Sequence, residues 1–264
     1  MAISLASLNR LSAPKPPRIV IYGPHGIGKN SFAGSAPRPV LINIEDGHPS
    51  GQPIDAFPKA ENFQDVMDAM AALYAEPHDF ETLVVDSLDW LEPLVWAETV
   101  RRNNVANPSK PWASIEDAGY GRGFVATLDV WREYLDAINA LRNDKGMAVI
   151  QTAHAEVKRF DSPETEPFDR YQIKLHKLAS ALVQEHADMV LFANFKTSVT
   201  RTDVGMKKVV RGVGAGTRAL YTEERPAFLA KNRHNLPPEL PLSWEALASA
   251  MAASSEAART SEAA

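Results

Sequence analysis

A glycine-rich segment near the N-terminus has the residue types and spacing of a phosphate-binding loop. Glycine and lysine stand in the pattern G-x-x-x-x-G-K, which ends at Lys29. Glycines at this spacing let backbone N–H groups point inward at phosphate oxygens, and the positive end of a following helix adds to the attraction. We expect Lys29 to reach the β- and γ-phosphates of a nucleotide. The residues predicted to bind it here are Gly23, Pro24, His25, Gly26, Ile27, Gly28, Lys29, Asn30 and Ser31.

The residue after the lysine departs from the usual pattern. A serine or threonine there ligates Mg²⁺ through its hydroxyl, whereas this chain has Asn30. An amide oxygen can ligate Mg²⁺, but it lies one bond further from the backbone, and Mg²⁺ tolerates poor geometry badly. Ser31 points about 100° further around the helix, so it is not a simple substitute. We therefore expect nucleotide binding to survive, while Asn30 weakens Mg²⁺ binding and hydrolysis.

Two acidic residues end apolar runs that read as buried strands. Asp86 follows Leu83, Val84 and Val85, at a position that suits the second Mg²⁺ contact, with a helix cap as the alternative. Glu45 follows the run 40–44 and suits a general base that activates the attacking water. Turn formation at 45–47 is the alternative for Glu45.

Two further polar residues lie at the end of the predicted strand 147–152. Gln151 and His154 could sense the γ-phosphate or relay its loss, although a lone histidine is more often structural. Asp46 competes with Glu45 for the role of base. Ser87 and Asp89 are expected to cap the segment that follows Asp86.

The elements that must position these residues alternate between strand and helix. The predicted strands are apolar throughout, which is typical of a parallel sheet covered on both faces in an α/β fold. Residues 155–177 are predicted to be a long loop, and residues 196–222 one or more hairpins with glycine turns. The predicted strands are 18–22, 40–44, 83–86, 147–152 and 189–193, and the predicted helices are 29–35, 63–73, 124–138 and 178–186.

Composition limits the class of protein. The 264 residues include 28 basic and 33 acidic side chains and no cysteine, which excludes disulfides and thiolate chemistry and fits a reducing cytoplasm. We find no apolar run long enough to span a membrane. We expect a loose N-terminal arm at 1–17, a single ATP-binding domain at 18–252 and a disordered tail at 253–264.

Later motifs extend the pattern. The phosphate loop is followed by Ile-Glu-Asp-Gly at 44–47, Val-Val-Asp-Ser at 84–87 and Gln-Thr-Ala-His at 151–154. Phe-Asp-Arg-Tyr-Gln-Ile-Lys-Leu-His-Lys at 168–177, Tyr-Thr-Glu-Glu-Arg-Pro at 221–226 and Ala-Lys-Asn-Arg at 230–233 complete the order. Over roughly residues 15–245 the chain resembles phage and prophage AAA-type ATP-binding proteins with a single RecA-like core. Such relatives are regarded as helpers of DNA recombination or replication.

The resemblance implies specific partners and roles. It implies ATP and Mg²⁺ as cofactors, with Lys29, Asp86 and Glu45 as the residues that use them. It also implies a homo-oligomer in the bacterial cytoplasm, where Lys231 and Arg233 would reach the nucleotide of a neighbouring subunit, with Arg218 as a second candidate. Single-stranded DNA and an annealing or single-strand-binding protein are the implied partners. The implied DNA contacts are Lys158, Arg159, Arg170, Tyr171 and Lys174.

Three functions remain open at this stage. The first is a DNA-linked oligomeric ATPase, and the second is a nucleotide-dependent binding module with little hydrolysis, which Asn30 favours. The third is a small-molecule kinase, against which stands the lack of an acceptor-site motif or an arginine-rich lid.

Overall fold

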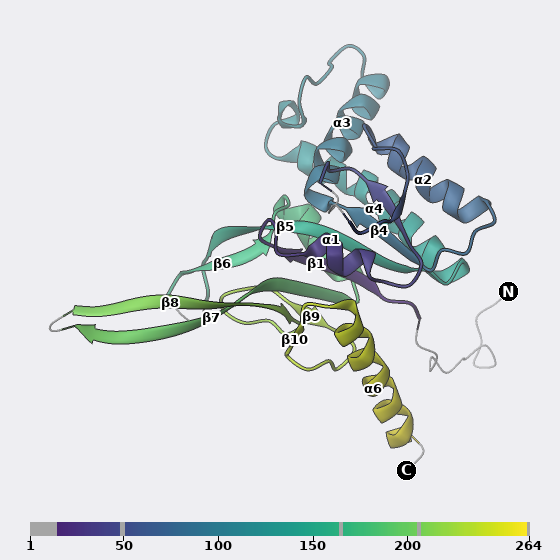
Figure 1. Ribbon diagram of the computed structural model, residues 1–264. Helices are drawn as coiled ribbons and strands as arrows, with labels where there is room; N and C mark the ends of the chain where they lie inside the picture. Colours follow the sequence, from purple (N-terminus) through teal and green to yellow (C-terminus); the bar gives the residue numbers. More distant parts are fainter. Residues whose placement is uncertain (1–14, 48–50, 164–165, 205–206, 263–264) are drawn as a thin grey trace.

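A mixed β-sheet with helices on both faces forms the body of the protein (Figure 1). The computed structural model describes residues 15–47, 51–163, 166–204 and 207–262. The strands are β1 (Arg18–Gly23), β2 (Pro39–Asn43), β3 (Asp55–Ala56), β4 (Thr82–Asp86), β5 (Ala148–Phe160), β6 (Phe168–Ile173), β7 (Met189–Val204), β8 (Lys207–Tyr221), β9 (Lys231–Asn232) and β10 (Glu239–Pro241). The helices are α1 (Lys29–Gly34), α2 (Phe63–Ala75), α3 (Leu88–Ala106), the short 3₁₀ helix η2 (Ile115–Ala118), α4 (Arg122–Asp144), α5 (Lys177–His186) and α6 (Trp244–Glu262).

The order of the strands decides which sequence segments meet. The sheet runs β10-β8-β7-β1-β5-β4-β2-β3, and its central strands β7, β1, β5, β4 and β2 are all parallel. Antiparallel strands β8 and β10 extend one side. The predicted α/β class with a mostly parallel sheet is confirmed. Because β5 lies between β1 and β4, the glycine loop after β1 and Asp86 at the end of β4 are separated by one strand.

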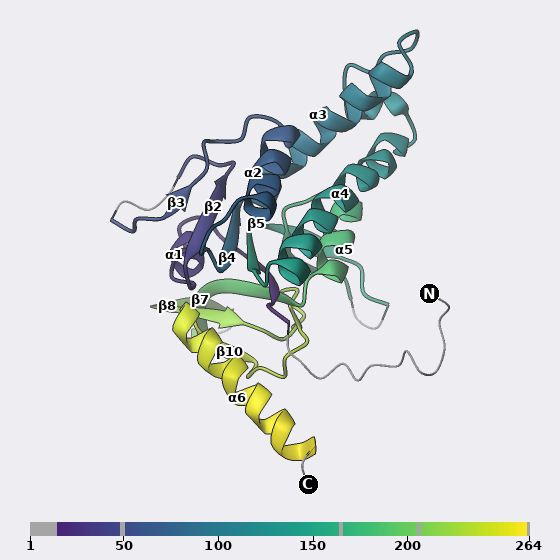
Figure 2. The same cartoon turned by 90° about the vertical axis from the view of Figure 1, so that its right-hand side faces the viewer.

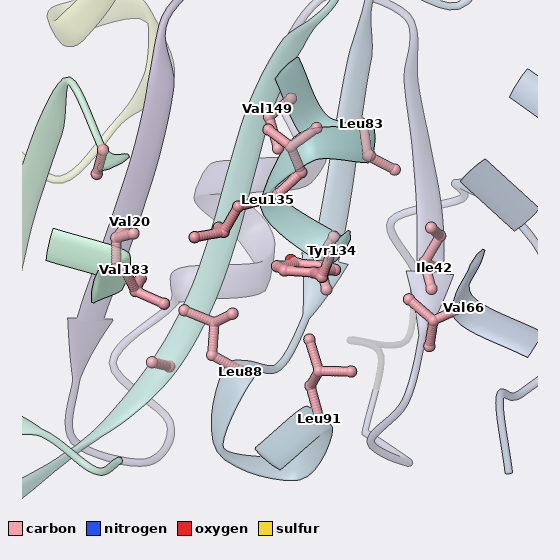
Figure 3. Close-up of a cluster of buried hydrophobic side chains, with 14 of the residues drawn as sticks. Val20, Ile42, Val66, Leu83, Leu88, Leu91, Tyr134, Leu135, Val149 and Val183 are labelled. Atoms are coloured by element: carbon pink, nitrogen blue, oxygen red, sulfur yellow. The ribbon is translucent and has the colours of Figure 1, made fainter. Parts of the chain in front are cut away.

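Two apolar layers sandwich the sheet. Helices α2 to α5 cover one face, and α1 and α6 lie on the other, as the two views together show (Figure 2). Figure 3 shows part of the larger layer, where Leu88, Leu91 and Tyr134 face side chains of the sheet. These three are fully buried. Each buried leucine stabilises the fold by about 1.5–3 kcal/mol, so this layer holds the strand ends that carry the polar residues.

Local sequence explains most elements. Helix α2 begins with a capping box, in which Asn62 accepts from the N–H of Asp65 and the Asp65 side chain accepts from the N–H of Asn62. Helix α3 was not predicted, although Leu88, Leu91 and Val95 are buried at helical spacing. Pro93 and the scattered charged residues of α3 conceal that pattern in the sequence.

The segment predicted as a long loop is a β-hairpin. Strand β5 continues to Phe160 and pairs antiparallel with β6, with Val157 opposite Tyr171. The prediction for 155–177 was therefore wrong, because its polar and charged residues, together with Pro163 and Pro167, are typical of a loop. Helix α5 begins directly after this hairpin, at Lys177.

Two predictions for the C-terminal third also need correction. The antiparallel pairing of β7 with β8 agrees with a hairpin region at 196–222, and the two strands project together from the body (Figure 1). The glycines predicted to form turns at 212, 214 and 216 lie within β8, and Gly205 lies outside the described residues. Residues 253–262, predicted to be disordered, continue helix α6.

The N-terminal arm is described only in part. Residues 1–14 lie outside the described residues, and Pro17 accepts a backbone hydrogen bond from Val149 at 3.0 Å, so the chain joins the sheet before β1. Within the described part of the chain, no helix has both the length and the apolar character that crossing a membrane requires.

Candidate functional site

The glycine loop joins β1 to α1 and requires glycine at defined positions. A Cβ on Gly23 would lie 2.2 Å from the carbonyl oxygen of Ala193 on β7. Gly26 and Gly28 have φ of +70° and +109°, a region that other residues rarely adopt. The loop borders a cavity of about 370 Å³. Its lining residues are His25, Gly26, Gly28, Lys29, Asn30, Ser31, Glu45, Gly47, Asp86, His154 and Arg218.

Most of the predicted loop residues therefore meet at one cavity, whereas Gly23, Pro24 and Ile27 do not line it. The side chain of Ile27 is fully buried in the apolar layer beneath α1. Pro24 contributes its carbonyl oxygen, which accepts a hydrogen bond from Lys29 Nζ at 3.1 Å. Both residues shape the loop rather than line the cavity.

Lys29 is a buried ammonium group held by the loop itself. Its Nζ donates to the carbonyl oxygens of Gly23 and Pro24, each at 3.1 Å. Burial lowers the pKa of Lys29, and the carboxylates of Asp86, Asp89 and Glu45 partly offset that effect. Because carbonyl oxygens are weaker partners for an ammonium than phosphate oxygens, an anion entering the cavity can recruit Lys29 from them.

Asn30 and Asp86 lie together, as the predicted magnesium site requires. Asn30 Nδ2 donates to Asp86 Oδ2 at 2.6 Å, and Thr152 on β5 donates to Asp86 Oδ1. Asp86 is only 4% exposed. Burial raises its pKa, and the hydrogen bonds from Thr152 and Asn30 partly offset this.

This donor set fits a Mg²⁺ ion. No salt bridge joins Asp86 to a cation among the described residues, so a hard cation beside it would balance a buried negative charge. Mg²⁺ needs only one or two protein oxygens when phosphates and water complete its shell. Asp86 is the residue that would hold the ion. Asn30 presents its amide N–H₂, and not its amide oxygen, to Asp86.

Glu45 lies at the opening of the same cavity. Its Oε2 accepts a hydrogen bond from Ser87 Oγ at 2.9 Å, and Ser87 is fully buried. The backbone N–H of Glu45 donates to the carbonyl oxygen of Asp86 at 3.0 Å. Ser87 is the N-cap residue of α3, as expected, but its hydroxyl makes no capping hydrogen bond and orients Glu45 instead. A carboxylate fixed in this way suits a general base.

The predicted competitor of Glu45 points elsewhere. Asp46 pairs with Lys59 at 2.7 Å and does not line the cavity. The two adjacent carboxylates therefore have different surroundings, which favours Glu45 as the base.

His154 belongs to a hydrogen-bonded group beside Glu45. Its backbone N–H donates to Asp89 Oδ1 at 2.9 Å, and its Nδ1 lies 2.8 Å from Asp89 Oδ2. This leaves Nε2 facing the cavity, 3.8 Å from Glu45 Oε1. Burial alone would raise the pKa of Asp89, but the hydrogen bonds from His154 outweigh it and hold that pKa below its usual value.

A second histidine packs on this group. The ring of His25 stacks on His154 with centroids 3.9 Å apart. His154 lowers the pKa of His25, with smaller contributions from burial and Lys29. The glycine loop and the end of β5 are thus in direct contact, so a change at His154 reaches the loop.

Three further predicted site residues, all outside the loop, do not line the cavity. Gln151 is buried on the opposite face of the sheet, where its Oε1 accepts from Tyr134 Oη at 2.9 Å. Lys231 Nζ donates to the carbonyl oxygens of residues 184, 185 and 187, at the end of α5. Arg233 Nη1 lies 3.6 Å from Asp188 Oδ1, just before β7. Both cations lie where strand β7 begins, at the opposite end of the parallel strands from the glycine loop. Lys231 caps the C-terminus of α5 there.

The predicted DNA-contacting residues are divided between the interior and the surface. Arg170 is 6% exposed, pairs with Glu224 and lies over the Phe160 ring at 5.0 Å. Tyr171 packs against the core, with its ring 5.2 Å from that of Phe192. These two residues anchor the β5–β6 hairpin and are not free for a ligand. The exposed cations of the hairpin region are Lys158, Arg159 and Lys174.

Sequence reasoning missed the position of Arg218. This residue stands near the end of β8, yet its Nη1 lies 2.9 Å from where a Cβ on Gly28 would be. Arg218 therefore faces the glycine loop of its own chain, whereas the sequence suggested a contact with a neighbouring subunit. Arg218 reaches Gly28 because β8 pairs antiparallel with β7 and runs back toward the glycine loop. No local sequence motif indicates this pairing.

Comparison with known families agrees with this geometry. An AAA domain matches residues 15–234, a range that includes the glycine loop, Glu45, Asp86, His154 and Arg218. No curated protein matches the chain significantly. Nucleotide binding, typically with Mg²⁺, is what this family implies. The chain therefore belongs to the AAA domain family of P-loop ATPases.

Proposed function

We propose that this protein binds ATP with Mg²⁺ in the cavity at the glycine loop and hydrolyses it. The observation that carries the proposal is the convergence of Lys29, Asp86 and Glu45 on one cavity from three separate strand ends. A cation, a buried carboxylate and an oriented carboxylate are the groups that phosphoryl transfer to water requires.

Each group has a defined task in the proposed reaction. Water attacks the γ-phosphorus, the bond from that phosphorus to the β–γ bridging oxygen breaks, and ADP leaves with the electron pair. Glu45 accepts the proton of the water while Ser87 keeps its carboxylate in place. Lys29 stabilises charge on the phosphate oxygens. When bound, Mg²⁺ neutralises phosphate charge, and Asp86 is the residue that would hold it.

The hydrolysis proposal is tested by comparing two adjacent carboxylates. We expect Glu45→Gln to keep ATP affinity within about threefold and to lower turnover by roughly 10²–10⁴-fold, the usual contribution of a general base. Asp46→Asn is the matched control, because Asp46 pairs with Lys59 outside the cavity, and it should leave turnover unchanged. Equal turnover in Glu45→Gln and wild type would contradict this role of Glu45.

A second candidate function is a nucleotide-dependent binding module with little hydrolysis. The hydrogen bond from Asn30 to Asp86 favours it, because that bond occupies one carboxylate oxygen that Mg²⁺ would use. Tight ATP binding by the wild-type protein with no phosphate release, with or without DNA, would support this alternative over the ATPase.

The finer proposal is that nucleotide turnover serves DNA recombination or replication in an oligomer that contacts single-stranded DNA. It rests on the resemblance to phage and prophage proteins and on the exposed cations Lys158, Arg159 and Lys174. Strand β5 runs without a break from His154 at the cavity to the hairpin, and the N–H of Lys174 donates to the carbonyl oxygen of His154 at 2.9 Å. DNA at the hairpin would therefore bias the residues beside Glu45. An annealing or single-strand-binding protein is the proposed protein partner.

The measurement for this proposal is the ATPase rate against protein concentration, with and without single-stranded DNA at low salt. We expect DNA to raise the rate and the rate per subunit to rise with concentration. The double variant Lys158→Ala/Lys174→Ala should lose the DNA effect, whereas the control Arg38→Ala/Lys145→Ala, which removes two exposed cations elsewhere, should keep it. A rate that scales linearly with protein and ignores DNA would overturn the finer proposal.

A further inference from the structure

A second cavity adjoins the phosphate cavity on the side of helix α6. Its volume is about 420 Å³, within the range of small-molecule sites. Helix α1 supplies Phe32, the segment before α6 supplies Leu242, and α6 itself supplies its first residue, Trp244. Neither the AAA domain match, which ends at residue 234, nor the sequence patterns assign a role to residues 242–245.

The two cavities adjoin along the glycine loop. Gly28, Ser31 and Arg218 line both of them. Three further cavities, at residues 38–80, 57–72 and 103–122, share no lining residue with the phosphate cavity. The nucleoside of a nucleotide whose terminal phosphates lie at Lys29 and Glu45 can therefore extend past Gly28 and Ser31 into this adjoining cavity.

The walls of the second cavity suit a flat heteroaromatic ring. Trp244 is partly buried, and its ring meets that of Phe32 edge to face, with centroids 5.9 Å apart and planes at 64°. Leu242 adds an apolar surface, while Ser243 and the exposed Glu245 add polar atoms at the rim. Apolar walls that hold the faces of a ring and polar groups that meet its edge are the features of a base-binding site.

Arg218 stands where the two cavities join. Its Nη1 lies 2.9 Å from where a Cβ on Gly28 would be, and a methyl carbon of Leu242 lies 3.8 Å from the same point. Within the described part of the chain, no hydrogen bond or salt bridge engages the guanidinium group of Arg218. A cation in this position matches the phosphate that links the nucleoside to the terminal phosphates, because guanidinium groups bind phosphate oxygens well.

We propose that the cavity between α1 and residues 242–245 binds the base and ribose of the purine nucleotide, with Trp244 contacting the base and Arg218 the adjoining phosphate. This inference rests on the proposed function, since it assigns the nucleoside end of the same ligand. It makes the C-terminal helix part of the nucleotide site.

The test separates the base from the phosphates by comparing ATP with inorganic tripolyphosphate at equal Mg²⁺. Affinities of both ligands are measured for wild type, Trp244→Ala and Trp244→Phe. We expect Trp244→Ala to weaken ATP binding by roughly 5- to 160-fold, the loss of one stacking contact, and to leave tripolyphosphate within twofold. Trp244→Phe keeps an aromatic ring and should stay within about threefold of wild type for both ligands. Trp112→Ala is the matched control, because Trp112 is also partly buried but lines a separate cavity.

The outcomes distinguish this inference from the proposed function. Wild-type protein that binds neither ligand would overturn both. Wild-type protein that binds ATP, together with Trp244→Ala of unchanged ATP affinity, would overturn the base site alone. If Trp244→Ala loses both ligands, a second measurement decides whether Trp244 contacts the base. The difference in tryptophan fluorescence between wild type and Trp244→Phe reports the signal of Trp244. Quenching of that signal by ATP and not by tripolyphosphate supports the site, and equal responses to the two ligands overturn it.

Discussion

Replacing Asn30 by threonine should increase Mg²⁺-dependent hydrolysis. In the structure, Asn30 Nδ2 donates to Asp86 Oδ2 at 2.6 Å, so the amide competes with Mg²⁺ for the buried carboxylate. A hydrogen bond to a charged group contributes about 1.5–3 kcal/mol. Displacing it would weaken Mg²⁺ binding by roughly 10- to 150-fold at equilibrium. Threonine removes this competitor and adds the hydroxyl ligand that phosphate loops usually supply.

The assay is phosphate release as a function of Mg²⁺ concentration at saturating ATP. We expect the Mg²⁺ concentration for half-maximal rate to fall by about tenfold or more in Asn30→Thr, with higher maximal turnover. Asn30→Ala separates the two effects, because alanine removes the competitor without adding a ligand. It should lower the half-maximal Mg²⁺ concentration without raising maximal turnover to the level of threonine. Identical Mg²⁺ dependence and turnover in wild type and Asn30→Thr would refute the reasoning.

Three further predictions follow from individual contacts. Ser87→Ala should lower turnover by roughly 2- to 12-fold with little change in the KM for ATP, measured by steady-state phosphate release, because Glu45 loses its orienting hydrogen bond. Gly28→Ala should reduce the free energy of unfolding by about 1–3 kcal/mol in urea titrations, because φ of +109° is strained for alanine and the new methyl group meets Arg218. Burial raises the pKa of Glu92 from 4.5 to about 7, so this group contributes stability below pH 4.5 that is lost as pH rises through 7. The free energy of unfolding of Glu92→Gln, measured relative to that of wild type, should therefore increase by about 3 kcal/mol from pH 4.5 to pH 8. Parallel pH profiles of the two proteins would contradict this.

Features with a local cause could be predicted from the sequence. The glycine loop is defined by residues that need unusual backbone angles directly after a β-branched strand. Glu45 and Asp86 each end an apolar run, and parallel strands place such ends at one edge of the sheet. Their meeting at the cavity therefore follows from short segments of sequence.

Features that depend on strand order or side-chain direction could not be predicted. Neighbouring residues of a strand point to opposite faces of the sheet. Thr152 therefore contacts Asp86, whereas Gln151, the residue predicted from the sequence, faces α4. A fully apolar strand carries no alternation that reveals which side is which. Likewise, Arg170 reads as an exposed cation, but Glu224, far along the chain, binds it beneath the hairpin.

The central claim is that the glycine loop and Lys29 hold the phosphates of a nucleotide. The most direct test is calorimetric titration of ATP with Mg²⁺ into wild type, Lys29→Ala and, as a control for an exposed lysine outside the cavity, Lys59→Ala. We predict that wild type and Lys59→Ala bind ATP equally. We predict that Lys29→Ala binds it at least about tenfold more weakly, because it loses a charge-assisted contact to phosphate. Equal affinity in wild type and Lys29→Ala, or no binding by wild type, would contradict the claim.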